Sequence, residues 1–147
     1  MPTMTDKSKE LHASVTLIND KLRFEGTAAG NDPLSIDYTA PLGDGLGYTS
    51  LELLLLSLSS CMGSSVLTLL RKMNMKVTKF VIHTNGVRKD EHPTGFGTIG
   101  MHIDVASPDM TEEGMQKAIS LAEEKYCPVF SMLKGNVTVA TNFTIQR

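Results

Sequence analysis

The longest hydrophobic pattern in the chain covers residues 50–74 and predicts a single long helix. A helix of about 24 residues, rising about 1.5 Å per residue, is roughly 36 Å long. Thr49 and Glu52 have the spacing of a capping box, in which the two side chains satisfy each other's backbone amides. Because apolar residues surround the first half of this helix instead of forming one stripe, we expect other elements to wrap around it.

Shorter patterns on both sides of this helix predict strands and two further helices. Alternating apolar and polar residues predict strands over residues 11–18, 22–28, 34–38, 77–87, 96–105 and 137–145. A second helix is expected to begin at Asp109 or Thr111, and a short third helix to run from Pro128 to Lys134. Helical spacing predicts one apolar face of the second helix at Met115, Ala118, Ile119, Ala122 and Tyr126.

This order of elements predicts an α+β fold with a mainly antiparallel sheet, because strands come in groups with helices between them. The length of 147 residues fits one domain with a substantial core, so we expect residues 1–147 to form a single domain. Residues 1–8 are polar and are expected to be loose.

Composition and charge exclude several classes of protein. A net charge of -2, with acidic and basic residues mixed, argues against binding to nucleic acid or to an anionic membrane surface. Residues 53–70 lack charges and reach the lower length limit of a membrane span, but six of them carry hydroxyl groups. We therefore expect a buried helix in a soluble protein, packed against its symmetry mate through the small residues Ser57, Ser60, Gly63 and Ser64. The first ten residues do not resemble a signal peptide, which favours the cytoplasm.

Two cysteines, Cys61 and Cys127, are the main candidates for chemistry. They are too few for a disulfide framework, and in the cytoplasm a thiol pair is more often catalytic or redox-active than structural. Cys127 precedes Pro128 and is expected to cap the short helix, where free amides and the helix dipole lower a thiol's pKa. Burial in the middle of a helix would raise the pKa of Cys61. Both could also be structural: Cys61 as inert core filling and Cys127 as a small residue at a helix junction.

Other candidate groups are less specific. The four histidines lack the spacing of metal ligands, so we expect no metal and no cofactor. The nine methionines suggest core filling or, alternatively, an adaptable apolar pocket. Arg23 and Arg88 are the cations that could fold toward Cys61. Glu52 lies nine residues before Cys61, so it projects roughly to the opposite side and about 13 Å away along the axis.

Three segments resemble motifs of the OsmC/Ohr family. The Leu-rich residues 52–61 are similar to the start of that family's central helix, and residues 121–129 are similar to its second cysteine motif. A turn typical of the OsmC-like (YhfA-type) branch is matched by Arg88, by Glu91, His92 and Pro93, and by Phe96. The resemblance extends over residues 11–145. It implies an OsmC-like fold, in which a sheet wraps around two long central helices of an intertwined homodimer with a site at the subunit interface.

The resemblance also implies an activity. Members of the family reduce organic hydroperoxides: the cysteine matching Cys61 is oxidised to a sulfenic acid, and the one matching Cys127 resolves it as a disulfide. A dithiol such as a lipoyl group can restore the pair. An arginine and a glutamate assist, but the glutamate position corresponds to Leu51, one residue before Glu52, and Arg23 is the candidate arginine. The alternative function is a non-catalytic protein that binds a small hydrophobic ligand at the dimer interface.

Overall fold

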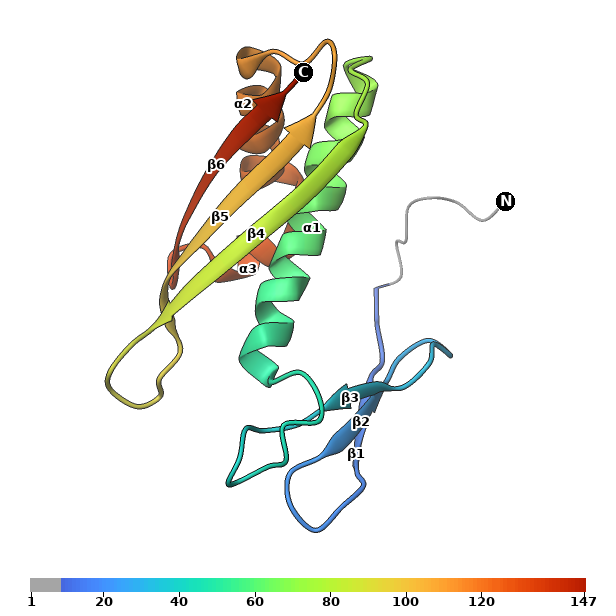
Figure 1. Ribbon diagram of the computed structural model, residues 1–147, viewed down its shortest axis with the longest axis vertical. Coiled ribbons are helices and arrows are strands. Elements are labelled where there is room, and N and C mark those ends of the chain that lie inside the picture. The colour runs from blue at the N-terminus through green and yellow to red at the C-terminus, as the bar shows by residue number, and fades with distance from the viewer. Residues whose placement is uncertain (1–8) are drawn as a thin grey trace. The chain divides into compact units, whose positions relative to one another are not determined.

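The computed structural model describes residues 9–147, which form two compact units, residues 9–52 and Leu53–Arg147. The predicted loose segment, residues 1–8, lies outside the described residues. Strands and helices follow each other in the predicted order, with one additional helical turn before the last helix (Figure 1). The expectation of a single domain over residues 1–147 stays a prediction.

The first unit is a small antiparallel sheet in the order β1-β2-β3. Its strands are β1 (Ser14–Leu17), β2 (Phe24–Thr27) and β3 (Leu34–Ile36), each shorter than predicted. The loop after β3 folds around the buried carboxylate of Asp37, which accepts backbone N–H groups of Tyr38, Asp44 and Leu46 at 2.7, 3.3 and 3.0 Å. These bonds, led by the one from Leu46, lower the pKa of Asp37 because they favour the ionised form.

The second unit contains the sheet β4-β5-β6 with all its helices on one face (Figure 1). β4 (Lys79–Arg88) and β5 (Phe96–Ala106) are antiparallel, whereas β6 (Thr138–Gln146) runs parallel to β5. The parallel pair follows from the helical connection between these strands, α2 (Glu112–Leu121), η1 (Ala122–Tyr126) and α3 (Pro128–Leu133). The α+β prediction is confirmed, with two three-stranded sheets in which antiparallel pairs predominate.

The long helix α1 (Ser50–Lys72) begins at the predicted capping box. The Thr49 amide donates to Glu52 Oε1 at 2.9 Å, and the Glu52 amide donates to Thr49 Oγ1 at 3.2 Å. One stripe of α1 is fully buried, at the four-residue spacing of one helix face, and consists of Leu58, Met62, Val66 and Leu70. The core that these residues form with the sheet and α2 supplies every fully buried apolar side chain among the described residues.

The sides of α1 away from this stripe are not enclosed within one chain. Only 28% of its most apolar 18-residue window is buried, and Leu56 is 51% exposed. The helix is long and apolar enough to cross a membrane by length and composition alone, a test that core helices of soluble proteins also pass. Of the small residues expected to pack against a symmetry mate, Ser57, Ser60 and Ser64 are exposed, whereas Gly63 faces the sheet, where a Cβ would lie 3.3 Å from Ile82 Cδ1. The packing itself stays a prediction.

Candidate active site

Cys61 lies in the middle of α1, directly before Met62 of the buried stripe. Its side chain is half-buried and packs against the core. The thiol therefore has apolar neighbours on one side and is partly accessible to solvent on the other. The helix fixes its direction, because both neighbouring turns of α1 are anchored through Leu58, Met62 and Val66.

Cys127 is positioned by a turn of π-helix, η1, which the sequence pattern did not reveal. Ordinary helical spacing predicted Tyr126 on the buried face, and this prediction is wrong, because Tyr126 is 48% exposed and Cys127 is 2% exposed. A π-turn holds one more residue than an α-turn, so the Cys127 amide donates to the Ala122 carbonyl at 2.9 Å. The additional residue carries the buried face from Tyr126 to Cys127.

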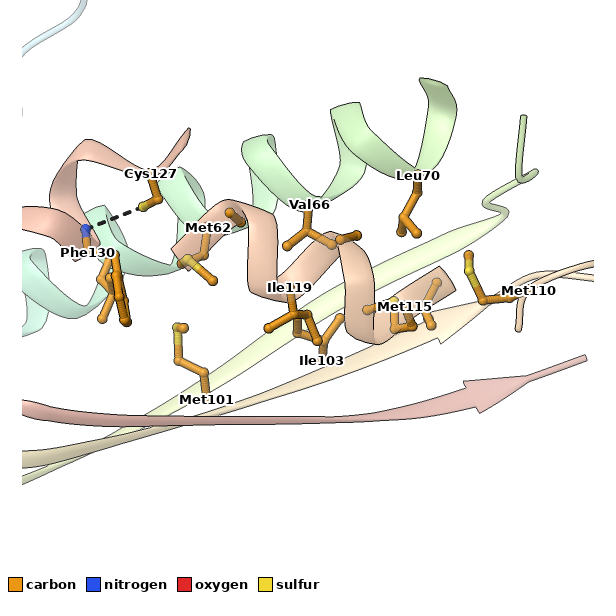
Figure 2. Close-up of a cluster of buried hydrophobic side chains, with 14 of the residues drawn as sticks. Met62, Val66, Leu70, Met101, Ile103, Met110, Met115, Ile119, Cys127 and Phe130 are labelled. Atoms are coloured by element: carbon orange, nitrogen blue, oxygen red, sulfur yellow. Dashed lines mark hydrogen bonds between the residues drawn. The ribbon is translucent and has the colours of Figure 1, made fainter. Parts of the chain in front are cut away.

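The predicted capping role of Cys127 is confirmed by the geometry. Cys127 is the N-cap of α3, Pro128 occupies the first turn, and the Phe130 amide donates to Cys127 Sγ at 3.4 Å (Figure 2). Figure 2 shows Cys127, Met62 and Phe130 together at one end of the hydrophobic core. The second thiol therefore lies at a helix start and also within the core.

The fold brings the two thiols together although they are 66 residues apart. Both cysteines are free, and Cys127 Sγ donates a hydrogen bond to Cys61 Sγ across 2.9 Å. A disulfide bond is about 2.05 Å long, so the sulfurs need to approach by only about 1 Å to bond. Local movement of one side chain or one helix turn is enough for this.

Burial, and after it the hydrogen bond to Cys61, raise the pKa of the Cys127 thiol from its ordinary value of 9.0 to about 12. The backbone amides of Phe130 and Val129 act in the other direction but do not compensate. The helix-cap argument from the sequence, which favoured Cys127 as the thiol with the lower pKa, is therefore wrong, because burial outweighs the cap. Cys127 keeps its proton and offers it to the Cys61 sulfur.

Comparison with known proteins identifies the family. A family model described as OsmC-like protein matches residues 43–142, more than half of the chain. The chain belongs to the OsmC-like family. Protein YhfA of Escherichia coli K12 is 26% identical to it over 124 residues, which cover 84% of this chain and 90% of YhfA.

Solved structures share the OsmC-like fold over most of their length. A hypothetical protein from Aquifex aeolicus VF5 superposes with a TM-score of 0.83 at 23% identity, covering 95% of this chain and 98% of that one. A Legionella pneumophila protein described as organic hydroperoxide resistance protein OsmC has a TM-score of 0.70 at 16% identity, covering 95% and 99%. At these identities the likeness establishes the fold.

The two assisting residues predicted for this OsmC-like chain, Glu52 and Arg23, have other hydrogen-bond partners. Glu52 accepts the Thr49 amide and hydroxyl in the capping box, at 2.9 and 3.1 Å. Arg23 lies in the N-terminal unit, where its Nε donates to Ser35 Oγ at 3.2 Å. Their catalytic roles stay predictions. Arg88 donates to the Thr94 carbonyl at 2.7 Å and also bonds the Thr94 hydroxyl, so it fastens the β4–β5 connection.

Two histidines and four methionines of the OsmC-like chain have clear structural roles. On the outer face of the sheet, His83 Nε2 and His102 Nε2 lie 3.2 and 3.1 Å from opposite oxygens of Asp104. Among residues 9–147, no cluster of three or more His, Cys, Asp or Glu has the geometry of a metal site. Four methionines fill the core, as the first of the two interpretations predicted: Met62, Met101, Met110 and Met115.

Proposed function

We propose that this OsmC-like protein reduces organic hydroperoxides through Cys61 and Cys127. The observation that carries the proposal is the hydrogen bond between two free sulfurs, 2.9 Å apart, inside one compact unit. The family also includes structural neighbours described as organic hydroperoxide resistance proteins, which supports a redox role.

The chemistry assigns different roles to the two thiols. Cys61, as the thiolate, attacks one peroxide oxygen; an S–O bond forms, the O–O bond breaks, and the alkoxide leaves as the alcohol after taking a proton from solvent. The sulfur of Cys127 then attacks the Cys61 sulfenic acid. An S–S bond forms, the S–O bond breaks, and the proton of Cys127 leaves with the hydroxide as water. A dithiol, for which a lipoyl group is the candidate, supplies two electrons and two protons to restore both thiols.

The electrostatics of the site support this division. A proton held on Cys127 and directed at Cys61 stabilises negative charge on the Cys61 sulfur, as any donor to an anion does. Cys61 is also the more exposed thiol, so a hydroperoxide reaches it first. The raised pKa of Cys127 makes it a poor attacker of peroxide, yet a neighbour 2.9 Å away needs little reactivity to capture a sulfenic acid.

Reduced protein treated with cumene hydroperoxide is expected to lose two thiols per chain and to gain one Cys61–Cys127 disulfide. Quantitative thiol titration and peptide mass spectrometry measure both changes, and dihydrolipoamide is expected to restore the thiols. If both thiols survive an excess of peroxide, the proposed activity is wrong. Native mass spectrometry showing a retained apolar ligand on such unreactive protein would favour the alternative, a binding protein for a small hydrophobic molecule.

We also propose that the protein works in the cytoplasm as a homodimer, the assembly that the family suggests. The uncovered side of α1 combines the exposed Leu56 with the small hydroxyl residues Ser57, Ser60 and Ser64, which allow a second helix to approach closely. Light scattering is expected to give twice the mass of one chain. A Ser60→Arg variant is expected to reduce that mass, because a long cation would separate the paired helices, whereas Gln116→Arg on the exposed side of α2 leaves it unchanged. A wild-type monomer at micromolar concentration contradicts the proposal.

A further inference from the structure

The face of the second sheet that packs against the helices is apolar except at one level. Along β4, Phe80 and Ile82 are followed on the same face by Thr84, and along β6, Val139 and Phe143 enclose Thr141. Thr84 and Thr141 both pair in register with Met101 of β5, so the three residues form one row across the sheet. We call Thr84, Met101 and Thr141 the hydroxyl row.

Each hydroxyl of this row is hydrogen-bonded to a helix that contains or adjoins one of the two cysteines. The hydroxyls of Thr84 and Ser59 are hydrogen-bonded, and since Ser59 donates its own proton to the Leu55 carbonyl at 2.8 Å, Thr84 is the donor. At the other end of the row, Thr141 Oγ1 donates to Glu123 Oε2 at 3.2 Å. The sheet is thereby connected to α1 on one side and to η1 on the other.

Both connections are close to the thiols along the chain. Ser59 precedes Cys61 by two residues on α1. Glu123 follows Ala122, whose carbonyl accepts the Cys127 amide and so sets the π-turn that directs Cys127 inward. Between the two connections, the side chain of Met101 is buried and points from β5 toward Met62 and Phe130 (Figure 2).

We propose that the hydroxyl row sets the separation of the two sulfurs, with Thr84 and Thr141 as positioning residues for Cys61 and Cys127. Apolar contacts alone allow packed helices to slide, whereas a hydrogen bond has a fixed length and direction. Both hydroxyls are part-buried, and withdrawing a hydroxyl from water is costly unless it is bonded, so the same row also resists movement of the helices away from the sheet. The inference rests on the proposed function only in treating the two thiols as a redox pair.

The test replaces the hydroxyls without changing the shape of the side chains. Thr84→Val and Thr141→Val remove one connection each, and Thr84→Ser and Thr141→Ser are the matched controls that keep it. The readout is the equilibrium of the protein dithiol with glutathione disulfide, which gives the protein disulfide and two molecules of glutathione. Because this reaction needs no hydroperoxide, it separates a failure of the inference from a failure of the proposed peroxidase activity.

Each valine variant is expected to lower the equilibrium constant for disulfide formation about tenfold, because two sulfurs that are held less closely have a lower effective concentration toward each other. Tenfold corresponds to about 30 mV for this two-electron couple. The serine variants are expected to stay within twofold of wild type. The double valine variant should lose less than the sum of the single losses, because both connections fix the same distance.

Equal equilibrium constants for the valine and serine variants would overturn the inference, even if the valine variants melt at a lower temperature. Circular dichroism distinguishes a change in folding from a change in thiol pairing. If a valine variant does not fold, Glu123→Ala removes the acceptor of Thr141 from the helix side, and Glu123→Gln keeps an acceptor oxygen as its control. No difference between these two in the glutathione equilibrium contradicts the role of Thr141.

Discussion

A Cys61→Ser variant is expected to lose reaction with cumene hydroperoxide by about a thousandfold or more, because the attacking sulfur is gone. Cys127, left alone, is buried and has a pKa raised to about 12 in the intact pair, so it offers almost no thiolate at neutral pH. Peroxide consumption measured with a ferrous–xylenol orange assay, under single-turnover conditions, checks the loss. Circular dichroism confirms that the variant is folded.

The complementary Cys127→Ser variant is expected to react once and then stop. It should consume one equivalent of peroxide and accumulate a Cys61 sulfenic acid that dimedone traps, followed by over-oxidation in excess peroxide.

Comparison with Cys127→Ala isolates the hydrogen bond, since serine keeps a donor beside the Cys61 sulfur and alanine does not. We expect the alanine variant to react several-fold more slowly in the first step, as befits one hydrogen bond to a charged group. Full peroxide reactivity in Cys61→Ser would contradict this assignment and would mean that Cys127 attacks the peroxide.

Local signals in the sequence were sufficient for the elements that carry the thiols. Thr49 and Glu52 mark the start of α1, and Pro128 after Cys127 marks the start of α3, because capping depends on residues within one turn. The buried stripe of α1 was harder to predict: its first half is rich in leucine on every side, so the pattern does not distinguish the sheet-facing stripe from the side left uncovered.

The π-turn had no clear signal in the sequence. Glu123, Glu124 and Lys125 between Ala122 and Tyr126 fit one ordinary α-turn, so helical periodicity places Tyr126, and not Cys127, on the buried face. The register that aligns Thr84 with Thr141 has no local signal either, because it depends on how β4 and β6 both pair with β5.

The pKa of Cys127 could not be predicted from its neighbours in the chain, since its largest cause is burial by residues from other elements. A helix start is worth about 1 kcal/mol to a nearby anion, whereas removing a thiolate from water costs more than that in an apolar core. The sign of the shift therefore depends on the tertiary packing around Cys127, which outweighs the opposing amides of Phe130 and Val129 at the start of α3.

Because its pKa is raised, Cys127 is expected to react with a pyridyl disulfide at a rate that rises about tenfold per pH unit from pH 7 to 10 without a plateau. The measurement uses Cys61→Ser, which leaves one thiol, and the serine hydroxyl can still accept the hydrogen bond that Cys127 donates. At pH 8 a thiol with a pKa of about 12 is about one part in ten thousand thiolate, against roughly a quarter for a thiol with a pKa of about 8.5.

Protonation lowers the reaction rate of this thiol by more than three powers of ten. The more basic thiolate is intrinsically more nucleophilic, which restores roughly one and a half of those powers of ten. The folded variant should therefore react about a hundredfold more slowly at pH 8 than the same chain unfolded in urea, before burial of the sulfur slows it further. The unfolded chain should reach a plateau near pH 9. A plateau near that pH in the folded protein would mean that the helix cap, and not burial, governs Cys127, and the proton would then no longer be held where the proposed resolution step needs it.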